Sequence, residues 1–254
     1  MIHFKLTLQY DGTNYSGWQR QKREVTIQGK IEECLRRIFK KEVTIRGAGR
    51  TDAGVHALSQ IATFRIDVEI AEDALKKALN SMLPRDIRVL RVDRVDDAFH
   101  PQYDVKRKSY IYFLSHGEEA SSFLQRYVWF YERRLDLSVM KKAGRLFLGR
   151  HDFSAFSGST EVKNRQRTIY QLEIKKVRSL AFLDLKISGN FIKFRIEADG
   201  FLKYMVRNIV GSIVEVGRGA VSLSAIAEAL KTGKRPNPLR TAPPQGLFLE
   251  RIIY

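Results

Sequence analysis

Cysteine is nearly absent from this chain, and its scarcity excludes a class of folds. The 254 residues contain a single cysteine, Cys34, so no internal disulfide can form and a disulfide-stapled scaffold is excluded. One thiol suits a reducing compartment, and we expect a cytoplasmic protein. No apolar run approaches the ~20 residues that a membrane-spanning helix needs, and the N-terminus is typical of a strand rather than a signal peptide. We therefore expect no membrane partner.

Signatures of metal and dinucleotide binding are also missing. The histidines show no paired ligand spacing and a lone cysteine cannot complete a zinc site, so we expect no metal and no cofactor. Gly47-Ala48-Gly49 begins a dinucleotide fingerprint, but Asp52 stands where its third glycine would be, and a strand is expected to follow instead of a helix. No Lys-Ser or Lys-Thr pair follows these glycines, which excludes a phosphate-binding P-loop.

Acidic residues are scarce relative to basic ones. Lys and Arg number 45 against 28 Asp and Glu, which gives a formal net charge of +17. In a globular chain such an excess points to a polyanionic partner, and nucleic acid is favoured over a membrane surface. A cell whose proteins are generally basic is the alternative explanation. The apolar fraction of 44% is enough for a core, and the length fits one large domain or two of ordinary size.

Hydrophobic periodicity predicts groups of strands with helices inserted between them. Strands are expected over 3–10, 43–45, 58–66, 86–95, 107–115, 168–177, 181–188, 190–198 and 246–253. Helices are expected over 27–39 with Thr26 as N-cap, and over 71–83, 136–149, 200–217 and 222–233. This order favours an α+β fold over a doubly wound parallel sheet. The pattern restarts near residues 100–106, which predicts two halves, 1–104 and 105–254.

The stretch RGAGRTDAGVHALSQ, residues 46–60, carries the clearest chemical signal. It places one carboxylate, Asp52, among glycines and two arginines. In the simpler interpretation, Asp52 bonds the backbone N–H groups of a tight turn. In the other, Arg46 and Arg50 lower the pKa of Asp52 and keep it ionised, which suits a nucleophile or a base better than a proton donor.

The helix expected over 200–217 has apolar residues on two sides, beside a row that contains Lys203 and Arg207. Burial on two sides would leave Arg207 partly desolvated, and a buried charge without a partner is strongly destabilising. Arg207 therefore needs an anionic partner. One alternative is a structural pair with a nearby carboxylate: Glu197, Asp199 or Glu215. We favour the other, in which Arg207 faces Asp52 across the two halves.

The stretch KSYIYFL, residues 108–114, puts Tyr110 and Tyr112 on one face of a strand, with Arg107 and Lys108 at its start. Aromatic rings beside cations suit the stacking of bases over a phosphate-binding surface. Tyrosines are commoner as core residues of a strand, so this stretch is a weak signal by itself.

Five motifs together resemble the tRNA pseudouridine synthase A family. They read YDGTNYSGWQRQ, GAGRTDAGVHALSQ, RKSYIYF, FLKYMVRNIVGS and TAPPQGL, and they run in order from Tyr10 to Leu247. The resemblance implies two pseudo-symmetric α/β halves with mainly antiparallel sheets, flanked by helices, and a basic catalytic cleft between them. It also implies a homodimer in which one tRNA touches both subunits. A departure at Lys203-Tyr204, before MVRN, affects no catalytic assignment.

The resemblance further implies a reaction and the residues that carry it. The reaction would be the isomerisation of uridine to pseudouridine at positions 38, 39 and 40 of the tRNA anticodon arm, with no cofactor and no metal. Asp52 would be the catalytic aspartate, Tyr110 would pack on the target base, and Arg207 would pair with Asp52. The remaining substrate contacts would be Arg50 for RNA or base extrusion, Leu247 near the pocket, and Arg46, Arg107 and Lys203 on RNA.

Two alternatives stay open. One is a pseudouridine synthase that acts on another RNA position. The other is a non-catalytic tRNA-binding protein with the same basic cleft. Loss of Asp52 would mark that second case, and Asp52 is present together with Tyr110 and Arg207. The chemistry needs one ionised carboxylate as nucleophile or base, and the sequence does not choose between those two routes.

Overall fold

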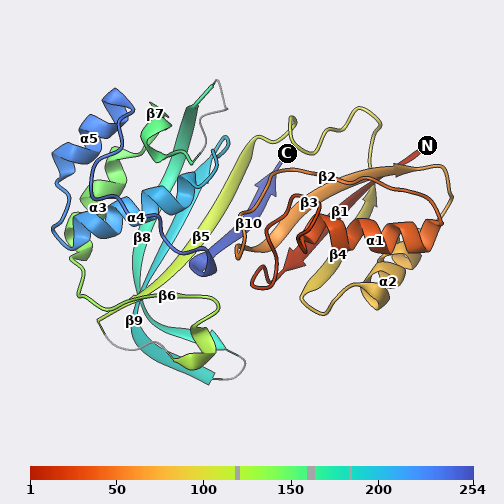
Figure 1. The fold of residues 1–254 in the computed structure, drawn as a ribbon, viewed down its shortest axis with the longest axis horizontal. Coiled ribbons are helices and arrows are strands. Elements are labelled where there is room, and N and C mark those ends of the chain that lie inside the picture. Colours follow the sequence, from red (N-terminus) through yellow and green to blue (C-terminus); the bar gives the residue numbers. More distant parts are fainter. Residues whose placement is uncertain (118–120, 159–163, 183–184) are drawn as a thin grey trace. The chain divides into compact units, whose positions relative to one another are not determined.

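The computed structural model describes residues 1–117, 121–158, 164–182 and 185–254, and Figure 1 colours it along the chain. Its contacts divide the chain into a first unit, Met1–Lys106 with Phe248–Tyr254, and a second unit, Arg107–Leu247. The division falls two residues after the expected boundary at residue 104. The closing strand, expected in the second half, lies in the first unit apart from its first residue, because it pairs with a strand of that unit.

The first unit is a mixed sheet with two helices. Its elements are β1 (Ile2–Tyr10), α1 (Ile27–Phe39), β2 (Arg46–Gly47), β3 (His56–Ile66), α2 (Glu72–Met82), β4 (Ile87–Arg94) and β10 (Leu247–Ile253). The strand order is β4-β1-β3-β10, and β2 also pairs with β3. The strand β1 runs antiparallel to β3 and β4, whereas β10 joins β3 in parallel.

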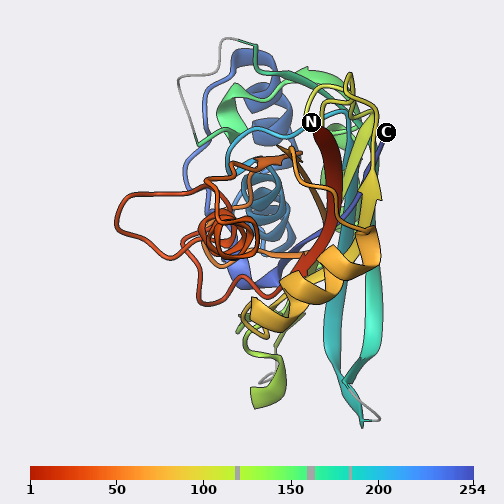
Figure 2. The same ribbon diagram turned by 90° about the vertical axis from the view of Figure 1, so that its right-hand side faces the viewer.

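The core of the first unit follows from alternation along β1 and from one helix stripe. Phe4, Leu6 and Leu8 point to one face of β1 and are fully buried. The Phe4 ring stacks on the Phe64 ring of β3, with their centroids 5.5 Å apart. The Phe39 ring of α1 also lies against Phe64, with centroids 6.2 Å apart. The helix α1 therefore packs on this face of the sheet. Figure 2 looks along α1, with α2 crossing in front of β1.

The second unit is a mainly antiparallel sheet with three helices. Its elements are β5 (Arg107–His116), β6 (Trp129–Tyr131), α3 (Leu137–Leu146), β7 (Gly149–Asp152), β8 (Gln166–Phe182), β9 (Leu185–Ala198), α4 (Met205–Gly217) and α5 (Leu223–Thr232). The strand order is β5-β9-β8-β7, with β6 parallel to β5. Figure 1 shows α3, α4 and α5 side by side, and α3 packs on β8 and α4.

The α+β class and the mainly antiparallel pairing are confirmed, and the cap on α1 is also as expected. The amide of Gly29 donates to the hydroxyl oxygen of Thr26 at 3.2 Å. The short strands β6 and β7 were not expected, because three or four residues are too few to show a periodicity. Across the described ranges, no helix combines the length and the hydrophobicity needed to cross a membrane.

Three expectations about element bounds were wrong. Residues 43–45 are irregular, and the strand begins only at Arg46. The three strands expected between 168 and 198 are two long ones, β8 and β9; of the expected strand 181–188, residues 183–184 lie outside the described residues and the flanks belong to β8 and β9. The helix expected from residue 200 begins at Met205, because Tyr204 adopts a left-handed conformation with φ of 61°.

Candidate active site

Asp52 stands at the start of a tight turn between β2 and β3. The amide of Val55 donates to the Asp52 carbonyl at 3.1 Å, and Gly54 supplies a positive φ of 76°. The side chain of Asp52 is half-buried, between the buried Thr51 and the exposed Ala53. The expected turn is present, and it leaves the carboxylate partly accessible.

The first motif, YDGTNYSGWQRQ, holds this turn in place. The amide of Trp18 donates to the Thr51 carbonyl at 3.0 Å, and the Tyr10 hydroxyl bonds the Thr51 hydroxyl at 2.8 Å. Burial raises the pKa of Tyr10 to about 12, against a smaller lowering by its hydrogen bonds, so the hydroxyl stays neutral at physiological pH. The residue before Asp52 is thus fixed through both its backbone and its side chain.

Two glycines of the same motif allow the backbones to approach each other. A Cβ on Gly12 would lie 2.0 Å from the Val55 carbonyl oxygen, and a Cβ on Gly17 would lie 2.6 Å from that of Thr51. Gly17 also has a positive φ of 88°. Any larger residue at either position would displace the Asp52 turn.

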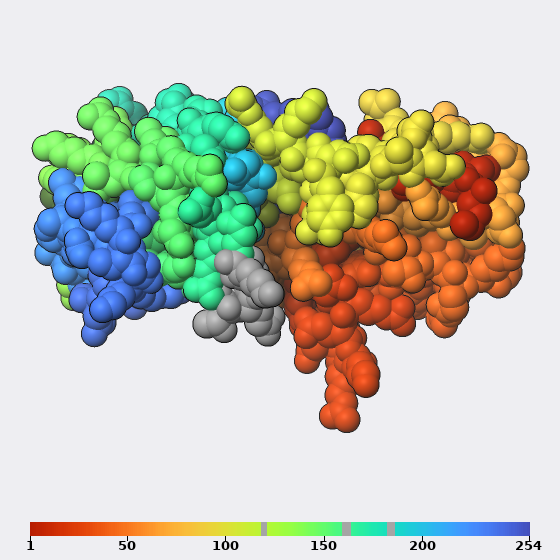
Figure 3. All heavy atoms as spheres, turned by 90° about the horizontal axis from the view of Figure 1, so that it is seen from above, coloured from red at the N-terminus to blue at the C-terminus, as the bar shows by residue number. Residues whose placement is uncertain are grey.

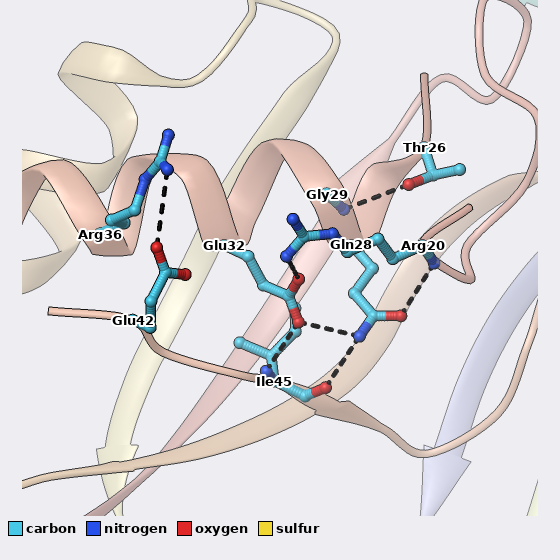
Figure 4. A network of polar contacts seen from close by, with 8 residues as sticks. All are labelled: Arg20, Thr26, Gln28, Gly29, Glu32, Arg36, Glu42 and Ile45. Carbon is cyan, nitrogen blue, oxygen red and sulfur yellow. Dashed lines mark hydrogen bonds and ion pairs between the residues drawn. The ribbon is translucent and has the colours of Figure 1, made fainter. Parts of the chain in front are cut away.

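A buried carboxylate, that of Glu32 in α1, holds the chain segment that precedes β2 (Figure 4). One Glu32 oxygen accepts from the Ile45 amide at 3.1 Å and from Gln28 at 2.9 Å, and the other accepts from Arg20 at 3.0 Å. Gln28 also donates to the Ile45 carbonyl at 3.2 Å. The network ties the segment before β2 to α1, so it fixes where the strand leading to Asp52 begins.

Basic side chains of the first unit are exposed around this turn. Arg46 and Arg50 are both exposed. Residues 20–25 are exposed along their whole length and include Arg20, Lys22 and Arg23. Figure 3 shows a projection in the orange-red of this part of the chain. These cations are placed for contact with a polyanion.

The helix α4 is buried on all sides except at one residue, in agreement with the burial expected from its two-sided apolar pattern. Of its residues, only Arg207 is not buried, and it is half-exposed. The Nε of Arg207 donates to the Ala242 carbonyl at 2.8 Å, and the Ala242 amide donates back to the Arg207 carbonyl at 3.0 Å. The last motif, TAPPQGL, is therefore attached to α4 at Arg207.

Further hydrogen bonds hold TAPPQGL between α4 and β5. The hydroxyl of Thr241 donates to the Asn208 side chain at 2.7 Å, and that of Tyr112 donates to the Pro243 carbonyl at 2.8 Å. Burial raises the pKa of Tyr112 well above its ordinary value, and the Arg207 charge lowers it by less, so Tyr112 stays a donor. Leu247 ends the motif and is buried at the start of β10.

We expect Gly211→Ala to destabilise the protein, although alanine is the better helix former. A Cβ on Gly211 would lie 1.8 Å from the Arg240 backbone carbonyl oxygen, whereas one on Gly144 of α3 would meet side-chain methyl groups, that of Leu172 at 3.0 Å and that of Ile174 at 3.1 Å. We expect Gly211→Ala to lower the free energy of unfolding by roughly 2 kcal/mol or more, and Gly144→Ala to change it by less than about 1 kcal/mol. Urea unfolding of the two variants measures the difference. Equal changes would contradict the crossing of residues 240–242 over α4.

Tyr110 is 9% exposed, and its ring meets Phe201 edge-on at 5.0 Å. Lys108 lies two residues earlier on the same face of β5. Burial lowers the pKa of Lys108 to about 8, and the positive charge of Arg167 acts in the same direction. The face of β5 that carries Tyr110 therefore also carries a cation.

Arg107 lies on the opposite face of β5 from Tyr110. It pairs with the buried Glu197 at 3.0 Å, and its guanidinium carbon lies 4.6 Å from the centre of the Tyr170 ring. The two tyrosines therefore share their face with Lys108 and not with Arg107.

The carboxylates considered as structural partners for Arg207 have other interactions. Glu197 pairs with Arg107 as described, Glu215 pairs with Arg218, and Asp199 accepts from the Thr168 amide at 3.0 Å. All three belong to the second unit, as Arg207 does, whereas Asp52 belongs to the first. The pairing of Arg207 with Asp52 stays a prediction.

Tyr204 is a residue of this region that the sequence patterns did not select. Its ring lies 5.0 Å from the Arg207 guanidinium carbon and 5.2 Å from the Lys203 ammonium nitrogen. A cation over the face of an aromatic ring is attracted to the ring electrostatically. The three-residue spacing between Tyr204 and Arg207 could have indicated their contact. No sequence pattern predicts the left-handed backbone conformation of Tyr204. Lys203 itself is exposed and precedes α4, so it forms no helical row with Arg207.

The five sequence motifs thus form two groups. The first two meet around Asp52 in the first unit, and the last three meet around Tyr112, Arg207 and Ala242 in the second. In the described parts of the chain, no group of three or more His, Cys, Asp or Glu side chains is arranged to hold a metal ion. Each unit therefore presents one set of polar side chains: a carboxylate on a turn, and an arginine with tyrosines.

Comparison with known proteins identifies the class. A family model described as tRNA pseudouridine synthase matches residues 7–104 and 143–254. A tRNA pseudouridine synthase A from Thermodesulfovibrio yellowstonii is 58% identical over 254 residues, covering 100% of both chains. One from Thermoanaerobacter pseudethanolicus is 41% identical, and a tRNA pseudouridine synthase A 2 from Bacillus anthracis is 39% identical, again over 100% of both chains. A crystal structure of a Cbf5-Nop10-Gar1 complex aligns with a TM-score of only 0.31 at 14% identity, over 83% of this chain and 54% of that one.

The family model and the relatives at 39–58% identity define an RNA-modifying enzyme of the isomerase class. The chain belongs to the tRNA pseudouridine synthase family. The resemblance of the five motifs to this family is confirmed.

Proposed function

We propose that this enzyme converts uridine to pseudouridine at positions 38, 39 and 40 of the tRNA anticodon arm, with Asp52 as nucleophile or base. The reaction breaks the bond between C1′ and N1, turns the uracil, and joins C1′ to C5. The proton on C5 is lost and N1 gains one, so the product is an isomer and no oxidant or water is consumed. One ionised carboxylate that attacks the sugar or the base, or removes a sugar proton, is sufficient.

The observation that carries the proposal is the construction of the Asp52 turn. The half-buried Asp52 follows Thr51, which is fixed by hydrogen bonds with Tyr10 and Trp18. On its other side the turn ends at Val55, whose backbone lies directly against Gly12. A carboxylate with a purely structural role does not require such fixation of its neighbours while staying accessible. A reacting group does, because catalysis depends on a preorganised position.

In this proposal Tyr110 stacks on the target base, and Arg207 interacts with the Asp52 carboxylate. A target uridine in or beside a stem must be extruded at a cost of about a few kcal/mol, and stacking on an aromatic ring returns roughly 1–3 kcal/mol. Tyr110 supplies that ring. Arg207, fixed by Ala242 at 2.8 Å, supplies a positive charge that keeps Asp52 ionised.

The net charge of +17 supports tRNA as the partner, held through its backbone with an affinity that falls as salt rises. Arg46, Arg50 and Lys203 are exposed and suited to phosphate contacts, and Leu247 to the pocket near the base. We also propose a homodimer in which one tRNA touches both subunits, working in the cytoplasm where tRNA is modified.

Tritium release tests the proposal directly, because replacing the C5 hydrogen releases the label. Transcripts would carry 5-³H-uridine at position 38, 39 or 40, or in a distant stem. We expect release from the three anticodon-arm positions and none from the stem. Release from the stem alone would assign another target to the same chemistry. Tight tRNA binding without release from any transcript would contradict catalysis.

A further inference from the structure

A cavity at one end of the second unit is lined by cations and by an imidazole that has no role in the proposed reaction. Its volume is about 340 Å³. It is lined by the end of β5, by neighbouring positions of β8 and β9, and by the segment between β6 and α3: His116, Gly117, Arg134, Leu135, Lys176 and Asn190. All of these residues belong to the second unit.

The strand register places this cavity on the face of the sheet that carries Tyr110. Leu114 of β5 and Lys176 of β8 both pair with Ile192 of β9, so the three side chains share a face. Tyr110 and His116 lie on that same face of β5, because side chains alternate along a strand. Six residues separate them, which corresponds to ~20 Å at ~3.3 Å per residue. Several nucleotides of RNA span such a distance.

Helix α3 packs on the same face and begins beside the cavity, two residues after the lining residue Leu135. A Cβ on Gly144 would meet Leu172 at 3.0 Å and Ile174 at 3.1 Å, so α3 packs on these β8 residues. Lys176 is the next residue along on this face, and it is exposed. The cavity therefore opens where the helical cover of the sheet ends.

Three side chains of the cavity lining have no polar partner among the residues that the structure describes: His116, Arg134 and Lys176. The Nδ1 atom of His116 is buried and has no hydrogen-bond partner, and such an atom costs about 1–3 kcal/mol unless a ligand or water satisfies it. Within the described residues, the side chain of neither Arg134 nor Lys176 forms an ion pair or a hydrogen bond, and both are exposed. The Arg134 side chain packs over Gly117, where a Cβ would lie 3.5 Å from its Cγ.

The chemistry of the lining selects an anion. Burial lowers the pKa of His116, and the charges of Lys176 and Arg134 lower it further, so the imidazole is neutral at pH 7. A neutral imidazole with its proton on Nδ1 donates one hydrogen bond into the cavity. Two cations, this donor and the Asn190 amide match the oxygens of a phosphate group, whose charge also offsets the repulsion between Arg134 and Lys176.

We propose that this cavity binds a backbone phosphate of the tRNA, at a site separate from the pocket of the target base. The proposal rests on the proposed function in taking tRNA as the ligand. It explains why two cations converge on a buried nitrogen far along β5 from Tyr110. It also predicts that the bound phosphate stabilises the protonated imidazole and so raises the pKa of His116.

The first test compares Lys176→Ala with Lys175→Ala by tRNA binding across a series of salt concentrations. The two lysines are neighbours on β8, but Lys175 points to the opposite face and pairs with Glu173 at 2.6 Å. We expect Lys176→Ala to weaken binding about 3- to 10-fold and to reduce the salt slope by about one ion, with no such change for Lys175→Ala. Equal affinities and slopes for the two variants would overturn the site.

The second test follows the His116 resonances by NMR through a pH titration, with and without tRNA, and with inorganic phosphate. We expect tRNA to raise the pKa of His116, and Lys176→Ala to reduce that rise. An unchanged titration with tRNA would mean that the cavity holds only water and would overturn the proposal. A response to inorganic phosphate alone would assign the cavity to a free anion instead of RNA.

Tritium release by Lys176→Ala at saturating tRNA separates this proposal from the proposed function. Lys176 touches no reacting group, so we expect the maximal rate to be unchanged while the tRNA concentration for half-maximal rate rises about 3- to 10-fold. If the wild type released no tritium, the proposed function would fail, yet the binding and NMR comparisons would still decide the phosphate site.

Discussion

Asp52→Asn is expected to abolish pseudouridine formation while leaving tRNA binding nearly intact. The change removes the negative charge and keeps the shape of a half-buried side chain on its turn. An amide is neither a nucleophile nor a base at neutral pH, so we expect tritium release to fall by about 10⁴-fold or more. The affinity for tRNA should stay within about three-fold, because the loss of one acidic group does not weaken phosphate contacts.

The matched control for this variant is Asp67→Asn. Asp67 is an exposed carboxylate of the same unit, paired with Lys41 at 2.8 Å. Its replacement should leave both the rate and the affinity unchanged, since a surface ion pair contributes little. Substantial activity in Asp52→Asn would remove this residue from the mechanism. Loss of tRNA affinity in Asp52→Asn, together with a lowered unfolding midpoint, would indicate a structural role for the turn instead.

Arg207→Leu is expected to have the second largest effect, a fall in rate of roughly 10²- to 10³-fold. Arg207 is the one residue of α4 that is not buried, and it is fixed by the Ala242 carbonyl at 2.8 Å. Replacing it removes the charge assigned to Asp52 and leaves the Ala242 carbonyl without its side-chain partner. The matched control is Arg178→Leu, an exposed arginine on β8. Comparable small effects of the two changes would reduce Arg207 to a structural residue.

A third variant, Arg207→Lys, separates charge from position. Lysine keeps the positive charge but has no Nε with which to donate to Ala242. If the charge supports Asp52, the pH profile of the rate should shift to higher pH in Arg207→Leu and much less in Arg207→Lys, because loss of a nearby cation raises the pKa of a carboxyl. If Arg207 only docks residues 241–247, both variants should lower stability equally and leave the pH profile unchanged.

Much of the local structure could be predicted from the sequence, because it depends on neighbours in the chain. The alternation in β1 and the stripe of α1 with its Thr26 cap were read correctly. The burial of α4 followed from apolar residues on two of its sides. The errors fell where local signals are weak or misleading. The β-branched residues 43–45 resemble a strand, yet the Ile45 amide donates to Glu32 of α1, and the strand pairing begins one residue later.

The start of α4 shows the limit of periodicity. Leu202 continues the apolar stripe of the helix, so the pattern extended the helix back to residue 200. The chain instead bends at Tyr204, whose ring lies close to the cationic groups of both Lys203 and Arg207. A left-handed conformation at a tyrosine is unfavourable by itself, and only the surrounding contacts stabilise it. No local pattern records those contacts.

The sequence by itself determined which chemical groups this enzyme has and the motifs that mark its family: an isolated carboxylate, tyrosines on a strand, an arginine on a buried helix, and a large excess of positive charge. Only the tertiary structure decided which of these groups meet. Trp18 with Thr51, and Arg207 with Ala242, 35 residues apart, are joined by backbone hydrogen bonds. Every residue but proline carries an amide that can form such bonds, and every residue carries the carbonyl, so the side-chain pattern does not reveal the pairing. The same holds for the phosphate site at His116, where three strands and a loop bring together residues that show no motif.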